Sequence, residues 1–108
     1  MIHVRFLYCN KQPMGFSMDG HAGFDVHGKD IVCAAVSALA LNTVNSIEAF
    51  TSDKFHVSVD EEEGSLHFRL EHAPGKEAAL LLKSLELGVR GIHEDYGREY
   101  IQVKKEEV

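Results

Sequence analysis

Apolar and polar side chains alternate at the start of the chain with the period of a half-buried β-strand. The apolar members of this alternation are Ile2, Val4, Phe6 and Tyr8. Turn residues follow at 10–13, and a second strand is predicted over residues 15–19, with Phe16 and Met18 on one face. The chain therefore opens with two short strands that lie close together in the sequence.

A hairpin is predicted in the middle of the chain. Its two strands are indicated by alternating apolar residues, which are Phe55, Val57 and Val59 in the first and Leu66, Phe68 and Leu70 in the second. The glutamates at 61–63 and Gly64 separate them, and we interpret this acidic run as a solvated turn rather than a binding site.

Two longer segments have helical spacing. Residues 31–49 are apolar over most of the helix circumference, which is typical of a central buried helix. Residues 76–94 carry apolar side chains at steps of four and three. A last strand is expected around Ile101, followed by a solvated tail at 104–108. The order ββαββαβ predicts an α+β fold with a mainly antiparallel β-sheet and two packed α-helices.

Length and charge restrict the classes of protein. The 108 residues are enough for a single domain, 1–108, with one core. The formal net charge of −6 makes the chain a poor nucleic-acid binder, because phosphate contacts need clustered Lys and Arg. We therefore expect no nucleic-acid partner, and a basic protein or peptide fits the charge better.

The apolar segments indicate the compartment. The alternation at residues 2–6 is not the apolar run of a signal peptide, and Asn42, Thr43 and Asn45 interrupt the richest apolar stretch within the roughly 20 residues that a bilayer span needs. We expect no membrane partner and a cytoplasmic location. Cys9 and Cys33 are then expected to be free thiols.

The strongest candidate chemistry lies in residues 19–37, DGHAGFDVHGKDIVCAAVS. Asp30 is a suitable N-cap for the helix predicted from residue 31, which makes Cys33 its third residue. A thiol there lies near free backbone N–H groups and the positive end of the helix dipole, which favour the thiolate and are candidates to stabilise an oxyanion. His21 precedes this helix in a loop.

That loop is predicted to be flexible because it contains three glycines, Gly20, Gly23 and Gly28. His21 can therefore fold back towards Cys33 as a general base, and a nucleophile beside a base is the arrangement that covalent catalysis needs. Segment 23–30 also matches a phosphate-loop pattern, but Asp30 stands where a magnesium-binding hydroxyl is required. The His and Cys spacings do not match zinc motifs, so no metal or cofactor is expected.

The same residues carry a family resemblance. DGHA at 19–22 and GKDIVCAAVS at 28–37 resemble the signature of the small bacterial ribosomal-processing cysteine proteases, the Prp family. The likeness continues through 44–45, FTS at 50–52 and IHEDY at 92–96, and so covers nearly the whole chain. The resemblance implies a cysteine endopeptidase that removes the N-terminal extension of a precursor of large-subunit ribosomal protein twenty-seven. It also implies aromatic residues just before the cut and a homodimer.

The resemblance assigns His21 and Cys33 as the catalytic dyad and gives Asp30 and Ser37 supporting roles. Other interpretations remain open for each residue, and His21 is alternatively a solvated loop histidine. Asp30 either orients His21 or only caps the helix, and Ser37 either contacts substrate or bonds back to the carbonyl four residues earlier. Cys33 is alternatively a packing residue. The protein would then be a non-catalytic ribosomal-protein-binding domain with a structural cysteine.

Overall fold

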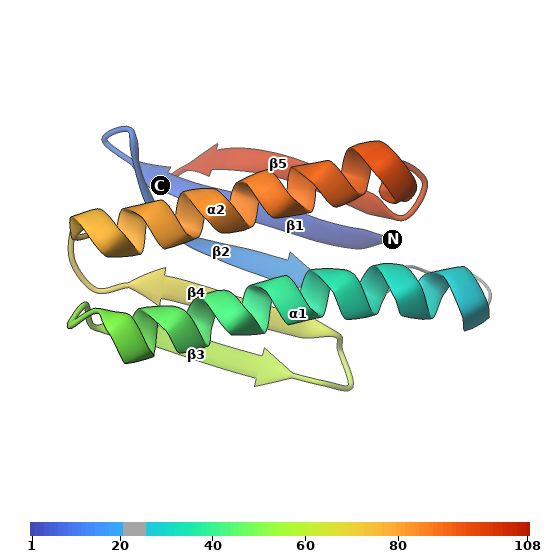
Figure 1. The fold of residues 1–108 in the computed structure, drawn as a ribbon, viewed down its shortest axis with the longest axis horizontal. Helices are drawn as coiled ribbons and strands as arrows, with labels where there is room; N and C mark the ends of the chain where they lie inside the picture. Colours follow the sequence, from blue (N-terminus) through green and yellow to red (C-terminus); the bar gives the residue numbers. More distant parts are fainter. Residues whose placement is uncertain (21–25) are drawn as a thin grey trace.

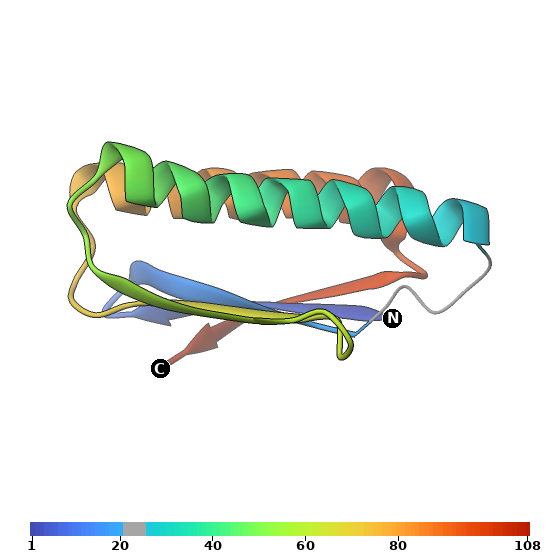
Figure 2. The ribbon, with the colours of Figure 1, turned by 90° about the horizontal axis from the view of Figure 1, so that it is seen from below.

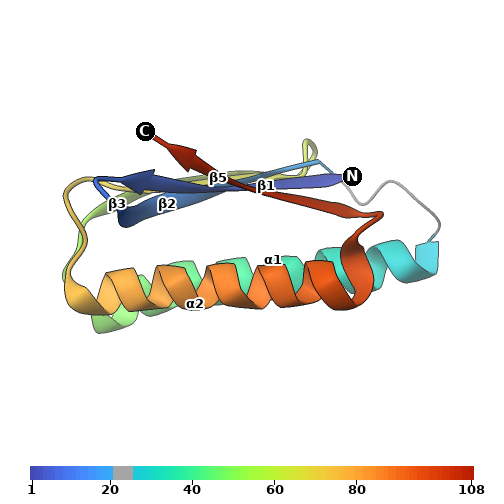
Figure 3. The same ribbon diagram turned by 90° about the horizontal axis from the view of Figure 1, so that it is seen from above.

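The computed structural model, which describes residues 1–20 and 26–108 apart from the side chains of 26–30, consists of two layers. The strands are β1 (Ile2–Cys9), β2 (Gln12–Asp19), β3 (Phe55–Asp60), β4 (Ser65–Leu70) and β5 (Ile101–Glu107). The helices are α1 (Val26–Phe50) and α2 (Lys76–Ile92), and a π-helical turn η1 (His93–Gly97) follows α2. Both helices lie on one face of the sheet, and no described helix or strand covers the other face (Figures 1, 2 and 3).

The strands form one sheet in the order β3-β4-β2-β1-β5. Three neighbouring pairs are antiparallel, and only β1 and β5 pair in parallel. The β1–β2 turn places Asn10 and Lys11 at positive φ, which matches the twist that a tight hairpin needs. The predicted α+β fold with the order ββαββαβ and a mainly antiparallel sheet is confirmed.

The core lies between the two layers. Phe6, Phe16 and Phe68 point from β1, β2 and β4 towards the helices and are at most 2% exposed. The helices bury a stripe each, formed by Val32, Val36, Ala40 and Ile47 in α1 and by Ala78, Leu82, Leu85 and Val89 in α2. The alternation and the helical spacing predicted from the sequence identify most of this core, but Val57 and Val59 of β3 are exposed and do not belong to it.

Four boundaries differ from the prediction. Strand β2 begins at Gln12, although a turn was expected over 10–13 and a strand only from residue 15. Helix α1 begins at Val26, five residues before the expected start, because Gly28 costs only about 1 kcal/mol in a helix interior and does not end it. Helix α2 ends at Ile92, and η1 continues the winding. Residues 104–108 are exposed, as expected, but the expectation of a tail is wrong, since β5 extends to Glu107 along β1 as an edge strand with charged side chains.

Helix α1 also overturns the expectation about bilayer spans. Its segment Ile31–Phe50 is long and apolar enough to cross a membrane by length and composition alone. Asn42, Thr43 and Asn45 do not prevent this, because they are uncharged and the Thr43 hydroxyl donates to the Leu39 carbonyl at 2.8 Å. Only the inner stripe of the segment packs on the sheet, and 28% of the segment is buried, so the expectation of a central buried helix is also wrong.

A polar network joins α2 to β1. The Tyr8 hydroxyl donates to Glu86 Oε1 at 2.6 Å, and Arg90 Nε donates to Glu86 Oε2 at 2.9 Å. Lys105 Nζ from β5 lies 4.4 Å from the centre of the Tyr8 ring. Glu86 is only 9% exposed, so both of its oxygens depend on these partners in place of water.

We expect this network to make stability depend on alkaline pH. Burial and the Glu86 carboxylate raise the pKa of Tyr8 from 10.0 to about 12. Because the folded pKa exceeds the unfolded one, the stabilisation from Tyr8 is complete below pH 10 and is lost as the pH rises through about 12. The unfolding free energy of wild type should therefore fall relative to Tyr8→Phe over this interval in urea titrations. A difference that stays constant across the interval would contradict the role of Tyr8.

Candidate active site

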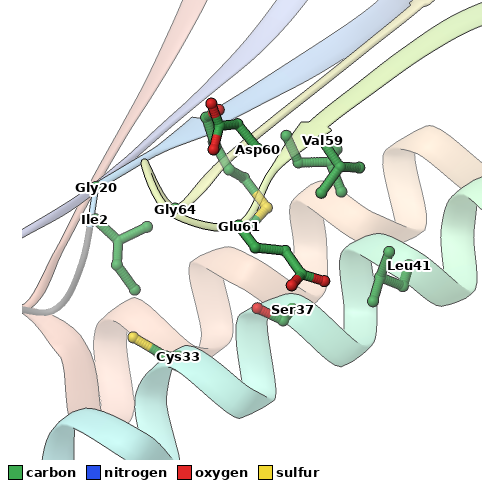
Figure 4. Close-up of a pocket in the computed structure, with 12 residues that line it drawn as sticks. Ile2, Gly20, Cys33, Ser37, Leu41, Val59, Asp60, Glu61 and Gly64 are labelled. Atoms are coloured by element: carbon green, nitrogen blue, oxygen red, sulfur yellow. The ribbon is translucent and has the colours of Figure 1, made fainter.

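An open cleft of about 300 Å³ lies between α1 and one end of the sheet (Figure 4). The ends of β1, β2, β4 and the β3–β4 turn meet there because these neighbouring strands are antiparallel. The cleft is lined by Ile2, Met18, Gly20, Cys33, Ser37, Leu41, Val59, Asp60, Glu61, Gly64, Ser65 and Leu66. It is therefore built from segments that are far apart in the sequence.

The α1 wall of the cleft is a stripe of three residues, Cys33, Ser37 and Leu41. They are spaced by four, so they lie one above the other on the helix (Figure 4). The neighbouring stripe that includes Val32 and Val36 is buried in the core and fixes how α1 is rotated about its axis. Core packing therefore turns the free, partly buried thiol of Cys33 towards the cleft.

The predicted position of Cys33 in the first helical turn is wrong. Because α1 begins at Val26, Cys33 is its eighth residue, and Asp30 lies inside the helix instead of at its N-cap. In a helix that begins at Val26, only the N–H groups of the N-cap and of the first three helical residues lack an intrahelical partner, and the last of these belongs to Gly28. The helix start therefore does not bring free N–H groups to Cys33 in the way the sequence suggested.

The other predicted site residues line the cleft, lie in the interior of α1 or fall outside the described residues. His21 and Gly23 lie outside the described residues. Gly20 ends the β2 side of the cleft at φ +93°, where a Cβ would lie 2.6 Å from the Met1 carbonyl oxygen, so the position requires glycine. Gly28 lies in α1 and is not part of a loop, which shortens the predicted flexible segment. Ser37 is exposed and lines the cleft one turn after Cys33.

Sequence reasoning missed the sheet side of the cleft. Glu61 belongs to the turn that we interpreted only as solvated, yet it lines the cleft together with Val59 and Asp60. No motif marks these residues. Only the strand order, which places the β3–β4 turn beside the end of β2, brings them opposite Cys33.

A free thiol in the wall of an open cleft on an α+β scaffold defines a candidate cysteine-dependent enzyme. The comparisons with known proteins give the particular class. The chain belongs to the family of cysteine protease Prp, whose family model matches residues 1–102. The resemblance predicted from residues 19–37 is therefore confirmed.

Individual relatives agree with this assignment. The ribosomal processing cysteine protease Prp of Staphylococcus aureus is 37% identical over 79 residues, which are 73% of this chain and 74% of the relative. Its Bacillus subtilis counterpart is 30% identical over 91 residues, or 81% of each chain. A crystal structure of the Staphylococcus aureus protease with a covalently linked product peptide has a TM-score of 0.89 at 32% identity, and the match covers 98% of this chain and 100% of that one.

Proposed function

We propose that this protein is a cysteine endopeptidase that removes the N-terminal extension of a large-subunit ribosomal protein precursor. The observation that carries the proposal is the position of the Cys33 thiol in an open cleft. Membership of the Prp family supports the reaction, and the names of the relatives support a ribosomal substrate. The relative with a covalently linked product peptide supports a peptide as the occupant of the cleft.

The proposed reaction uses Cys33 as nucleophile and His21 as general base. His21 takes the thiol proton, the thiolate attacks the scissile carbonyl, and the same proton passes to the leaving amine as the C–N bond breaks. Water, deprotonated by His21, then hydrolyses the thioester and restores the thiol. His21 directly follows Gly20 in the chain, and Gly20 lines the cleft, which supports a histidine acting there.

Supporting roles are proposed for Ser37 and Asp30. The Ser37 hydroxyl lies in the cleft wall one turn from the thiol, where a substrate amide or carbonyl can reach it. Asp30 precedes Cys33 by three residues in α1, and its proposed role is to orient His21, since it does not cap the helix.

We also propose a homodimer in the cytoplasm that has neither nucleic-acid nor membrane partners. The family resemblance supports the homodimer. Leu80 and Leu87 are 67% and 76% exposed and lie two turns apart on α2, which gives the outer helix surface apolar side chains that a partner can cover. The net charge of −6 supports the exclusion of nucleic acid.

The proposal is tested with the purified protein and the ribosomal precursor. Intact-mass spectrometry should show conversion of the precursor to one shortened product, while the mature form stays uncut. His21→Ala should lower the rate by about a hundredfold or more, which is the usual contribution of a general base. His72→Ala is the matched control, because His72 is exposed and does not line the cleft. An uncut precursor would refute the function, and full activity of His21→Ala would refute the dyad.

A further inference from the structure

The charged residues of the cleft all have the same sign. Among the described residues that line it, only Asp60 and Glu61 are charged, and both are acidic. The other described lining residues are apolar, glycine, serine or the Cys33 thiol. Among the described lining residues, a peptide that enters therefore meets negative charge on the sheet side and the uncharged Cys33, Ser37 and Leu41 on the α1 side.

The two acidic residues differ in their hydrogen bonding. Asp60 Oδ1 accepts the Glu63 backbone N–H at 3.2 Å and so holds the β3–β4 turn. No hydrogen bond or ion pair joins the Glu61 carboxylate to another described residue. Its side chain extends from the turn towards Ser37 on α1, across the cleft (Figure 4). Glu61 is therefore the acidic lining residue whose carboxylate has no partner among the described residues and extends into the cleft.

The surroundings of Glu61 fit a long cationic side chain. Leu41 and Val59 also line the cleft and are 47% and 56% exposed, so apolar surface borders the carboxylate. Lysine and arginine carry an apolar stem and a charged end, and they pack the stem on such surface while the end reaches a carboxylate. Neither a neutral nor an acidic side chain satisfies both features.

We propose that Glu61 is a specificity-determining residue that selects substrates with a lysine or arginine close to the scissile bond. This inference rests on the proposed function of the same cleft. Ser37, towards which Glu61 extends, lies four residues or about 6 Å along α1 from Cys33. An extended peptide advances about 3.3 Å per residue, so the selected cation lies about two residues from the cut.

The test uses short fluorescein-labelled peptides with two adjacent phenylalanines before the scissile bond. In separate peptides, each of the other positions is occupied in turn by lysine, glutamine or glutamate. Cleavage by wild type and binding to the inactive Cys33→Ala protein are both measured. At one position about two residues from the cut, lysine should improve kcat/KM and affinity about threefold over glutamine, and glutamate should lower both. This preference should weaken as salt is added, because ions from the solvent enter an open cleft and screen the attraction between lysine and Glu61.

The variants decide whether Glu61 is responsible. Glu61→Gln should remove the preference for lysine, and Glu61→Lys should reverse it in favour of glutamate. Glu62→Gln is the matched control, because it makes the same charge change in the same turn at a residue that does not line the cleft. Its preference should match that of wild type.

Three results would overturn the inference: equal ranking of the three side chains at every position, a preference that survives in Glu61→Gln, or absence of peptide binding. Since binding is measured without cleavage, the two proposals fail separately. Peptides that bind with the lysine preference but stay uncut would refute the protease function and retain the role of Glu61. Peptides that are cut without a charge preference would do the reverse.

Discussion

Replacement of Cys33 by alanine is expected to lower peptide cleavage by about four orders of magnitude or more, because removing a nucleophile abolishes the covalent route. The reason lies in the cleft, where Cys33 is the one cysteine among the described lining residues. The rate should be measured with the ribosomal precursor under single-turnover conditions. Circular dichroism should show an unchanged fold, since the thiol is only partly buried and alanine suits a helix.

Cys9 provides the matched control for this substitution. It is also a free, partly buried cysteine, but it lies at the end of β1 and does not line the cleft. Cys9→Ala should cleave the precursor at nearly the wild-type rate. If Cys33→Ala retained activity, or if Cys9→Ala lost it, the assignment of the nucleophile would be wrong.

Replacement of Phe68 by alanine is expected to lower the free energy of unfolding by about 3–5 kcal/mol, the usual cost of removing a buried phenylalanine. Phe68 is 1% exposed, and its ring centre lies 5.4 Å from that of Phe16 and 5.0 Å from that of Phe55. The loss would therefore open a cavity between β2, β3 and β4 beneath the helices. Urea denaturation followed by circular dichroism measures the change.

Phe50→Ala is the control for Phe68→Ala. Phe50 ends α1 and is 77% exposed, so the same chemical change should alter the unfolding free energy by less than about 0.5 kcal/mol. If both variants lost a similar free energy of unfolding, the packing of Phe68 against Phe16 and Phe55 would not be a main contribution to stability.

Most strands and most of the core could be predicted from the sequence, because a strand that is buried on one face has alternating apolar and polar residues. The alternation of Ile2, Val4 and Phe6 identifies both the strand and its inner face. The alternation of Phe55, Val57 and Val59 also identifies β3, although no residue of that edge strand is buried. The ends of a helix are harder to predict from the sequence. Asp30 has the chemistry of an N-cap, but any helix that begins earlier makes that signal irrelevant.

The sequence predicted the α1 side of the cleft but not the sheet side. Cys33 and Ser37 lie within one motif, so their shared helix face follows from their spacing. Glu61 and Val59 reach the cleft only because β4 pairs with β2, a long-range contact that no local pattern encodes. The parallel pairing of β5 with β1 was missed in the same way, and the charged residues at its end were therefore expected to be a solvated tail instead of part of the strand.

The most direct test of the central claim, that the Cys33 thiol performs the reaction, is a titration with iodoacetamide. The protein is alkylated in steps, the modified fraction of each cysteine is mapped by peptide mass spectrometry, and precursor cleavage is measured on the same samples. The account predicts that activity falls in proportion to alkylation of Cys33 and is independent of alkylation of Cys9. Full activity in protein whose Cys33 is completely alkylated would contradict it.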